Sequence, residues 1–540
     1  MRAAPVKRAS IGQAFRWRAG LLVALAAAAC SAVAAPATEL SAQAERGKRI
    51  FVDGESESGI PITAIVSNGG TPIPASILPC AGCHGPDGQG RPEGGVVPPA
   101  VTWNSLTAAN GHEHTYGRTH PAFDTSTLAA AVTGGVDPAG NALDSTMPRY
   151  RMSESDMADL IAYLQELEGD LDAGLTETTI RVGTLLPAGE TAGGVGPAMQ
   201  NVLEGMFADI NSSGGIHGRR IELVVAEYGD DFVQNVWRVR ELLEQDSIFA
   251  LVGGYSVGIE AELAKIAEEF EVPVVGPYTQ LPRNGNDGDR HTFYLTGGLI
   301  EQAAVLARSA AQSAEDGEPR IAIVHPVGAI YTQAVAAVQA QLSALGSTEA
   351  VAVPFTPPFF DAVAVVDALI EAPISSVLVV APAKEFRRLG NELARRNLSP
   401  ELLLPGIFAS NTMFEIDAGF GGRVRVAYPS IPADHSPAGV QQFEKLHAEH
   451  AFGYEHSTAQ ISAFVAAEVL AEGLKRAGRA LSREKLFTAL EGLSEFRPGL
   501  MPALSYGRKH RIGAYGGYVL EVDLQQKKFS GASDWISLRN

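Results

Sequence analysis

Two cysteines and a histidine near the amino end have the spacing needed to hold a cofactor. Cys80, Cys83 and His84 form the pattern C-x-x-C-H. Two thiols on one turn can attach a haem covalently, and an imidazole directly after them can ligate its iron. A disulfide or a thioredoxin-like pair uses the same cysteine spacing, but redox pairs lie near a βαβ pattern, and this one lies among Pro and Gly. The motif therefore predicts one covalent haem c.

A second axial ligand to the iron must come from farther along the chain. The methionines between the motif and residue 170 are Met147, Met152 and Met157. Met157 falls on the apolar face of a helix that the pattern predicts in "SESDMADLIAYLQELEG", and Met152 immediately precedes the cap of that helix. Met147 lies in the loop "DSTMPRY", where it is free to point at the iron. We predict axial ligation by His84 and Met147.

Three further histidines leave a bis-histidine alternative open. His112, His114 and His120 lie in the segment "NGHEHTYGRTHPAF". Nothing in their spacing requires iron ligation, and we interpret them as solvated loop side chains. With two protein ligands on the iron, no position remains for oxygen or peroxide, so the expected chemistry is the transfer of single electrons.

The first 34 residues predict a secretory signal peptide. A basic start without acidic residues is followed by the apolar run "AGLLVALAAAAC" and by a small-residue cleavage site that ends at Ala34. We expect cleavage near Ala34 rather than lipidation at Cys30, because lipoprotein signals usually carry leucine three residues before the cysteine, where this chain has Ala27. The apolar run is too short to span a bilayer, so we expect an exported periplasmic protein.

Composition limits the classes of partner. The chain has 540 residues, enough for three or four folding units at roughly 150 residues each. With 42 Lys and Arg against 61 Asp and Glu, the net charge is −19. Nucleic acid is excluded as an expected partner, because binding to phosphates relies on clusters of Lys and Arg.

Beyond a short polar linker, the sequence changes character. Apolar runs such as "TIRVGTLLP", "RIELVVAEY" and "SSVLVVAPA" alternate with amphipathic helical stretches. This alternation predicts α/β architecture with parallel sheets buried on both faces.

Motifs for nucleotide binding and catalysis are missing from this region. Gly194 and Gly196 begin a G-x-G-x-x-G pattern, but Met199 stands where the third glycine belongs. The sequence contains no G-x-S-x-G or H-E-x-x-H motif. We interpret His447, His450 and His456 as a polar helix end rather than as metal ligands. We therefore expect no catalytic centre in this region, and a binding protein and electron carrier rather than an enzyme.

The amino-terminal third resembles a family of electron carriers. Residues from about 46 to 168 are similar to a class I bacterial cytochrome c, with "GKRIF", "CAGCHGPDGQG", "MPRY" and "DMADLIAYLQEL" in the order that the family shows. The resemblance supports haem c with His84 and Met147 as axial ligands.

The remainder resembles the leucine/isoleucine/valine-binding type of periplasmic solute-binding protein, which serves ABC transporters. The resemblance runs from about Thr179 to Ile536, on "IRVGTLLP", "GMFADINSSGGIHGRRIELVVAEYGDD", "FALVGGYSVG", "VPVVGPYT" and "RIAIVHPVGAIYTQAV". It implies two α/β lobes of the type I binding-protein fold, which close over a small molecule by hinge motion.

Together these resemblances imply a multidomain chain in which a small all-α cytochrome c domain precedes a two-lobed α/β fold. We expect a cytochrome c domain over residues 35–168, a linker over 169–178 and a solute-binding domain over 179–540. Lobe 1 is expected at about 179–297 and 428–505. Lobe 2 is expected at about 298–427 and 506–540.

The family motifs also imply ligand-binding positions at the carboxyl ends of strands. Carried over motif by motif, these are Tyr255, Ser256, Tyr278 and Thr279 in lobe 1, with Tyr331 and more weakly Ala383 and Phe408 in lobe 2. Amino-acid binders of this type place an acidic residue in the loop that reads Ile407 to Ser410 here, where no carboxylate occurs. Because a buried ammonium without a counter-charge is costly, a less polar, carboxylate, aromatic or alcohol-derived ligand is expected.

Three functions fit these features. The leading interpretation is an exported haem c–solute-binding fusion that binds a small organic ligand and exchanges electrons with a dehydrogenase or another cytochrome. The second is the substrate-binding component of an ABC transporter, with a permease as partner and the haem domain as an accessory. The third is the electron-accepting subunit of a periplasmic dehydrogenase.

Overall fold

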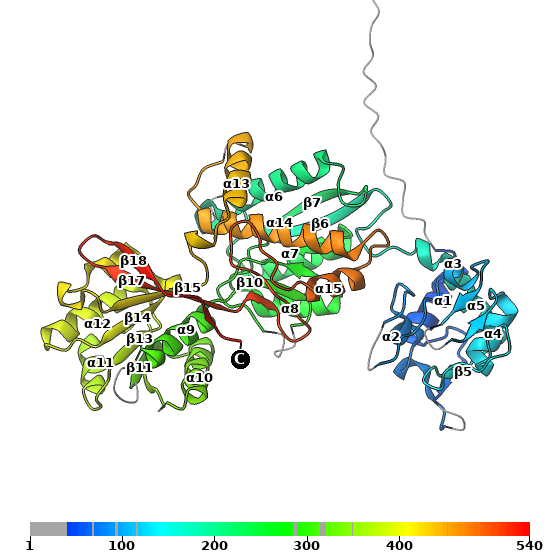
Figure 1. The fold of residues 1–540 in the computed structure, drawn as a ribbon, viewed down its shortest axis with the longest axis horizontal. Helices are drawn as coiled ribbons and strands as arrows, with labels where there is room; N and C mark the ends of the chain where they lie inside the picture. The colour runs from blue at the N-terminus through cyan, green and yellow to red at the C-terminus, as the bar shows by residue number, and fades with distance from the viewer. Residues whose placement is uncertain are drawn as a thin grey trace, which may run out of the picture.

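The computed structural model describes residues 40–539, except 67–69, 92–94, 115–116, 190, 285–288, 314–319, 348 and 451. The predicted signal peptide, with Cys30, lies outside the described residues. The described chain forms a helical unit and two α/β lobes, with the helical unit beside the first lobe and the second lobe at the opposite end (Figure 1). No helix among the described residues is long and apolar enough to cross a membrane.

The helical unit is organised around the packing of α1 (Ala42–Asp53) on α5 (Glu154–Glu166). The two helices approach closely at Gly47, where a Cβ would lie 2.0 Å from the carbonyl oxygen of Asp159. The rings of Phe51 and Tyr163 pack with centroids 5.6 Å apart in the core. Ser153 caps α5 in a capping box, as the sequence predicts.

Shorter elements complete this unit. Its other helices are α2 (Cys80–His84), α3 (Trp103–Leu106) and α4 (Thr125–Gly134). Its strands are β1 (Thr63–Ile65), β2 (Ile73–Pro74), β3 (His112–Glu113), β4 (Thr119–His120) and β5 (Arg149–Arg151). They form the three-stranded sheet β2-β1-β5 and the hairpin β3-β4, two features that a purely all-α prediction did not include.

Lobe 1 is a six-stranded parallel sheet in the order β16-β10-β9-β8-β6-β7. Its strands are β6 (Thr179–Pro187), β7 (Arg220–Tyr228), β8 (Ala250–Val252), β9 (Val274–Val275), β10 (Thr292–Thr296) and β16 (Ile512–Ala514). Its helices are α6 (Val195–Ser212), α7 (Phe232–Gln245), α8 (Glu260–Glu269), α13 (Pro437–His450), α14 (Ser457–Ala477) and α15 (Arg483–Glu491). Helix α14 is the centre of the packing, since most of its residues are buried in the largest apolar cluster.

Lobe 2 is built on a sheet in the order β12-β11-β13-β14-β15-β17-β18, with β19 paired to β17. Its strands are β11 (Ile321–Pro326), β12 (Val351–Phe355), β13 (Ser376–Val379), β14 (Glu401–Pro405), β15 (Val424–Tyr428), β17 (Gly516–Asp523), β18 (Lys528–Ala532) and β19 (Ile536–Ser537). Its helices are α9 (Leu299–Gln312), α10 (Ala329–Ala344), α11 (Ala362–Leu369) and α12 (Ala383–Arg395). The first five strands run parallel, and the last three add antiparallel pairs at one edge.

The chain passes between the lobes three times. It crosses after β10, again after β15, and a third time between β16 and β17. The third crossing corrects the predicted boundary near residue 505. Residues 512–514 pair with β10 as an edge strand of lobe 1, so lobe 2 resumes only at β17.

A buried carboxyl on α14 makes the stability of lobe 1 depend on pH. Burial raises the pKa of Glu468 from 4.5 to about 7, and its Oε2 accepts a hydrogen bond from the backbone N–H of Gly499 at 3.0 Å. Between these two pKa values the folded state holds a proton that the unfolded state has released, so the free energy of unfolding falls as the pH rises.

We therefore expect Glu468→Gln to raise the free energy of unfolding at pH 8.5 by about 2 kcal/mol, with little change at pH 4.5. Denaturant unfolding of both proteins at the two pH values measures the difference. An equal effect at both pH values would contradict the assignment.

Candidate functional site

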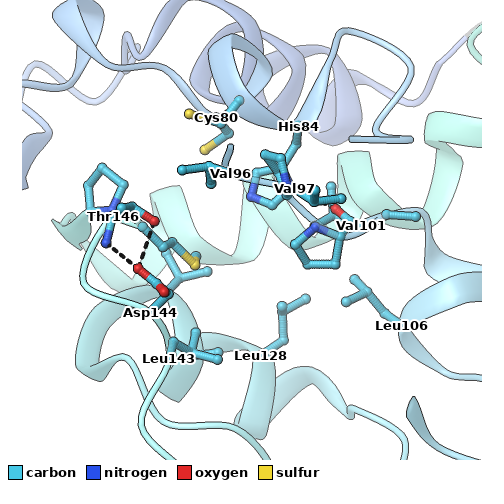
Figure 2. Close-up of a pocket in the computed structure, with 18 of the residues that line it drawn as sticks. Cys80, His84, Val96, Val97, Val101, Leu106, Leu128, Leu143, Asp144 and Thr146 are labelled. Atoms are coloured by element: carbon cyan, nitrogen blue, oxygen red, sulfur yellow. Dashed lines mark hydrogen bonds between the residues drawn. The ribbon is translucent and has the colours of Figure 1, made fainter. Parts of the chain in front are cut away.

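The helical unit encloses a cavity of about 640 Å³, within the range of roughly 300–1,000 Å³ usual for cofactor sites. Helix α2 supplies one wall. Figure 2 shows Cys80 and His84 on that wall, with Leu128 and Leu143 across the cavity from them. Most of the surface inside is apolar, which suits a flat hydrophobic ring system.

The two thiols lie at the cavity wall on one short helix. Cys80 is half-buried and Cys83 exposed, and neither is in a disulfide. Burial raises the pKa of the Cys80 thiol to about 12, so it is protonated at neutral pH. Helix α2 ends at His84 and is capped by Gly85, whose φ of 77° favours glycine and whose N–H donates to the carbonyl of Ala81. Both cysteines and the histidine therefore lie on a single turn.

His84 has the protonation state of a metal ligand. Its Nδ1 lies 2.9 Å from the carbonyl oxygen of Pro99, which fixes the N–H at Nδ1 and leaves Nε2 with a free lone pair. Burial lowers the pKa of the ring, so the neutral form predominates at neutral pH. The ring lines the cavity and is only 9% exposed.

Met147 lies in a braced loop of the same cavity. The preceding turn is held by Asp144, whose Oδ1 accepts hydrogen bonds from the N–H and the hydroxyl of Thr146, both at 2.9 Å (Figure 2). The guanidinium of Arg149 donates to the carbonyl oxygens of Leu143, at 3.0 Å, and of Met147. These bonds fix the backbone that carries the Met147 side chain.

The other two candidate methionines do not line the cavity. Met157 is 8% exposed in the apolar core, as the sequence predicts, and Met152 packs against that core. The structure thus brings two free thiols, a neutral imidazole and one thioether into a single cavity. This donor set fits a covalently attached, six-coordinate haem c.

The three histidines of the β3-β4 hairpin also line the cavity. His114 Nε2 lies 2.9 Å from His120 Nε2, and His120 Nδ1 lies 2.7 Å from the carbonyl oxygen of Pro121. His120 is only 6% exposed, which contradicts its interpretation as a solvated loop side chain. The cause is the hairpin register, which sets His112 opposite His120 and turns the rings inward.

In lobe 1 a row of three tyrosines follows the carboxyl ends of strands. Tyr255 and Tyr278 stack with ring centroids 5.6 Å apart and an interplanar angle of 25°. Tyr228, at the end of β7, continues the row 6.2 Å from Tyr255. The Tyr228 hydroxyl is buried without a hydrogen-bond partner, and burial raises the pKa of all three phenols. Sequence reasoning missed Tyr228, although its place at the end of an apolar run was a usable signal.

Ser256 and Thr279, the other two predicted ligand-binding residues of lobe 1, lie next to this row of tyrosines. Ser256 is 2% exposed, and its N–H donates to the carbonyl of Tyr278 at 2.9 Å. The Thr279 hydroxyl donates to Glu260 Oε1 at 2.8 Å. Both residues therefore lie with the tyrosines, and their polar groups bond to other parts of the protein.

The lobe 2 candidates differ in accessibility. Tyr331 lies in the first turn of α10 and Phe408 ends a short 3-10 helix after β14; both are half-buried. Ala383, the first residue of α12, is 4% exposed and belongs to the apolar core, so it is poorly placed for a ligand. Residues 406–410 carry no carboxylate.

Comparison with known proteins agrees with both parts of the fold. The family model described as periplasmic binding protein matches residues 179–528, and the model described as cytochrome c matches residues 74–168. The chain is similar to the Leu/Ile/Val-binding protein BraC3 of Rhizobium johnstonii, with 25% identity over 62% of this chain and 89% of that protein.

Solved structures share the two-lobed fold. A putative branched-chain amino acid ABC transporter protein from Rhodospirillum rubrum aligns with a TM-score of 0.53 and 15% identity, covering 65% of this chain and 99% of that one. A branched-chain amino acid ABC transporter protein from Thermus thermophilus, with bound valine, aligns with a TM-score of 0.52 and 15% identity, covering 67% and 98%. These matches confirm the predicted fold class: a helical cytochrome c region followed by a type I α/β binding-protein fold. The chain belongs to the periplasmic binding protein family, and it carries a cytochrome c domain in front of the binding region.

Proposed function

We propose that this protein is a periplasmic electron carrier with one covalent haem c, fused to a region that binds a small organic ligand between its lobes. The observation that carries the haem assignment is the convergence of Cys80, Cys83, His84 and Met147 on one cavity. When bound there, haem c supplies transfer of one electron at a time.

The residues of the cavity have distinct roles in this proposal. Cys80 and Cys83 would hold the cofactor covalently, and His84 and Met147 would ligate its iron. The hydrogen bond from His84 Nδ1–H to Pro99 keeps Nε2 directed away from that carbonyl and available to iron. In this arrangement His84 and Met147 would keep water and oxygen off the metal, and no catalytic centre is proposed in this chain.

Cysteine substitutions test the attachment. We expect Cys80→Ser and Cys83→Ser each to keep one thioether bond, so that haem still migrates with the polypeptide under denaturing conditions. The double variant is expected to lose all covalent haem, as measured by haem staining and intact mass. Covalent haem in the double variant, or none in the wild-type chain matured in the periplasm, would contradict the proposal.

For the binding region we propose a ligand without an ammonium group. The R. johnstonii relative is named for leucine, isoleucine and valine, and the T. thermophilus structure holds valine. The loop at residues 406–410 of this chain argues against binding of the same amino acids. It has Ile407, Phe408 and Ala409 and no carboxylate. The tyrosine row in lobe 1 offers ring faces and a buried, unpartnered hydroxyl, which favour an aromatic, carboxylate or alcohol-derived ligand.

A second candidate function is delivery of that ligand to an ABC permease. Membership in the binding-protein family favours it. The leading proposal instead requires a redox partner, either a dehydrogenase or another cytochrome. Co-purification from the separated membrane and periplasmic fractions distinguishes the two, because a permease would be recovered with the membrane and a soluble redox partner with the periplasm.

A further inference from the structure

The loop that follows the haem motif is joined to the amino end of α15 in lobe 1. Asp87 Oδ2 accepts a hydrogen bond from the Ser482 hydroxyl at 3.0 Å, and Lys485 Nζ lies 3.9 Å from the same oxygen. Arg91 Nε lies 3.0 Å from Glu484 Oε1. Five side chains, two from the haem loop and three from the amino end of α15, thus connect the haem unit to the binding region.

The same end of α15 is fixed firmly to lobe 1. The Arg483 guanidinium donates to the carbonyl oxygens of Ile248 at 2.6 Å, Phe270 at 2.9 Å and Phe249 at 3.1 Å. Its backbone N–H donates to Asp172 of the interdomain linker at 2.6 Å. The haem loop therefore contacts a helix end that is hydrogen-bonded to lobe 1 at several points.

Arg91 contacts both the haem-binding turn and the amino end of α15. Arg91 is one of the residues that line the cavity, and its side chain pairs with Glu484. Its backbone N–H donates to the carbonyl of Cys83 at 2.9 Å, which holds the residue against the haem-binding turn. A charge on Arg91 is therefore held close to the haem site.

We propose that the Arg91–Glu484 pair makes the haem potential depend on docking of the haem loop against α15. This inference rests on the proposed haem c. Reduction adds one electron from the redox partner to the iron site, so a nearby uncompensated cation favours the reduced state. In the docked arrangement Glu484 offsets the cation, and separation of the two surfaces removes that offset and raises the midpoint potential. The binding region thereby regulates the electron carrier to which it is fused.

Charge-neutralising variants of the full haem-loaded chain test whether the Arg91–Glu484 pair sets the haem potential. In spectroelectrochemical titrations we expect Glu484→Gln to raise the midpoint potential and Arg91→Gln to lower it. The double variant is expected to return close to the wild-type value. Each single shift should shrink in high salt, since both side chains are partly exposed.

A matched ion pair on lobe 2 provides the control. Arg387 and Glu415 pair between α12 and the segment that follows β14, at the end of the molecule opposite the haem unit (Figure 1). We expect Glu415→Gln and Arg387→Gln to leave the potential unchanged. An unchanged potential in Glu484→Gln, or shifts of the same sign in both single variants, would overturn the inference. Absence of a c-type haem spectrum would instead overturn the proposed function.

Discussion

Replacement of Met147 by alanine is expected to lower the midpoint potential of the haem by on the order of 0.2 V, part of the ~0.8 V span that axial ligands cover. The thioether raises the potential because it stabilises the reduced iron. Met147 is the one of the three candidate methionines that lines the cavity. We also expect loss of the weak methionine-to-iron absorption band. Spectroelectrochemical titration and optical spectra of the full chain measure both effects.

The neighbouring methionines are internal controls for this variant. Met157→Ala removes a side chain that is 8% exposed in the core, so it should lower the free energy of unfolding by about 2–5 kcal/mol while the potential stays near wild type. Met152→Ala should change neither quantity by much. Retention of the methionine band in Met147→Ala, with its loss in Met152→Ala, would identify Met152 as the ligand instead.

The second large effect concerns ligand choice. We expect leucine and valine to bind at least about 10³-fold more weakly than a cognate ligand, because leaving an ammonium buried without a carboxylate costs several kcal/mol. The expectation rests on residues 406–410, which carry no carboxylate in the loop where the resemblance to amino-acid binders implies an acidic residue. Calorimetry with leucine, and with the same carbon skeleton lacking its amino group, isolates the effect of the ammonium group on the binding free energy.

Tyrosine variants test where such a ligand binds. Once a ligand is identified by mass spectrometry of molecules released from the purified protein, Tyr255→Ala and Tyr278→Ala should each weaken its binding. Tyr454→Ala, on an exposed side chain after α13, is the matched control. Tight leucine binding by the wild-type protein would contradict the ligand class, and equal effects in all three variants would contradict the location.

The grouping of the candidate haem-binding residues at one cavity could be predicted from the sequence because three of them are adjacent along the chain. Cys80, Cys83 and His84 are contiguous on one turn, and Met147 could be chosen because the helical pattern assigned Met157 to the core. The inward position of His120 could not be predicted from the sequence, because it depends on the register of a hairpin whose two strands have two residues each. Short strands with so few residues carry no periodic signal.

The order of strands in the sheets explains the other two differences between the sequence predictions and the structure. Tyr228 joins Tyr255 because β7 and β8 flank β6 in the sheet, a neighbourhood that no local pattern specifies. The crossing after residue 514 was placed too early because Ile512–Ala514 is a three-residue edge strand, identifiable only through its pairing with β10. The apolar and β-branched runs of the longer strands, by contrast, were sufficient to predict the α/β class.

The attachment of α15 to both the linker and the haem loop has an optical consequence. As long as the haem loop stays docked on α15, the proposed haem site would keep its position relative to the tyrosine row while lobe 2 moved about the three crossings. A haem absorbs across the visible range, so the proposed cofactor would quench the emission of a dye placed near it. A dye attached to lobe 2 would grow dimmer or brighter as that lobe approaches or recedes, and the protein would report its own closure as a change in emission.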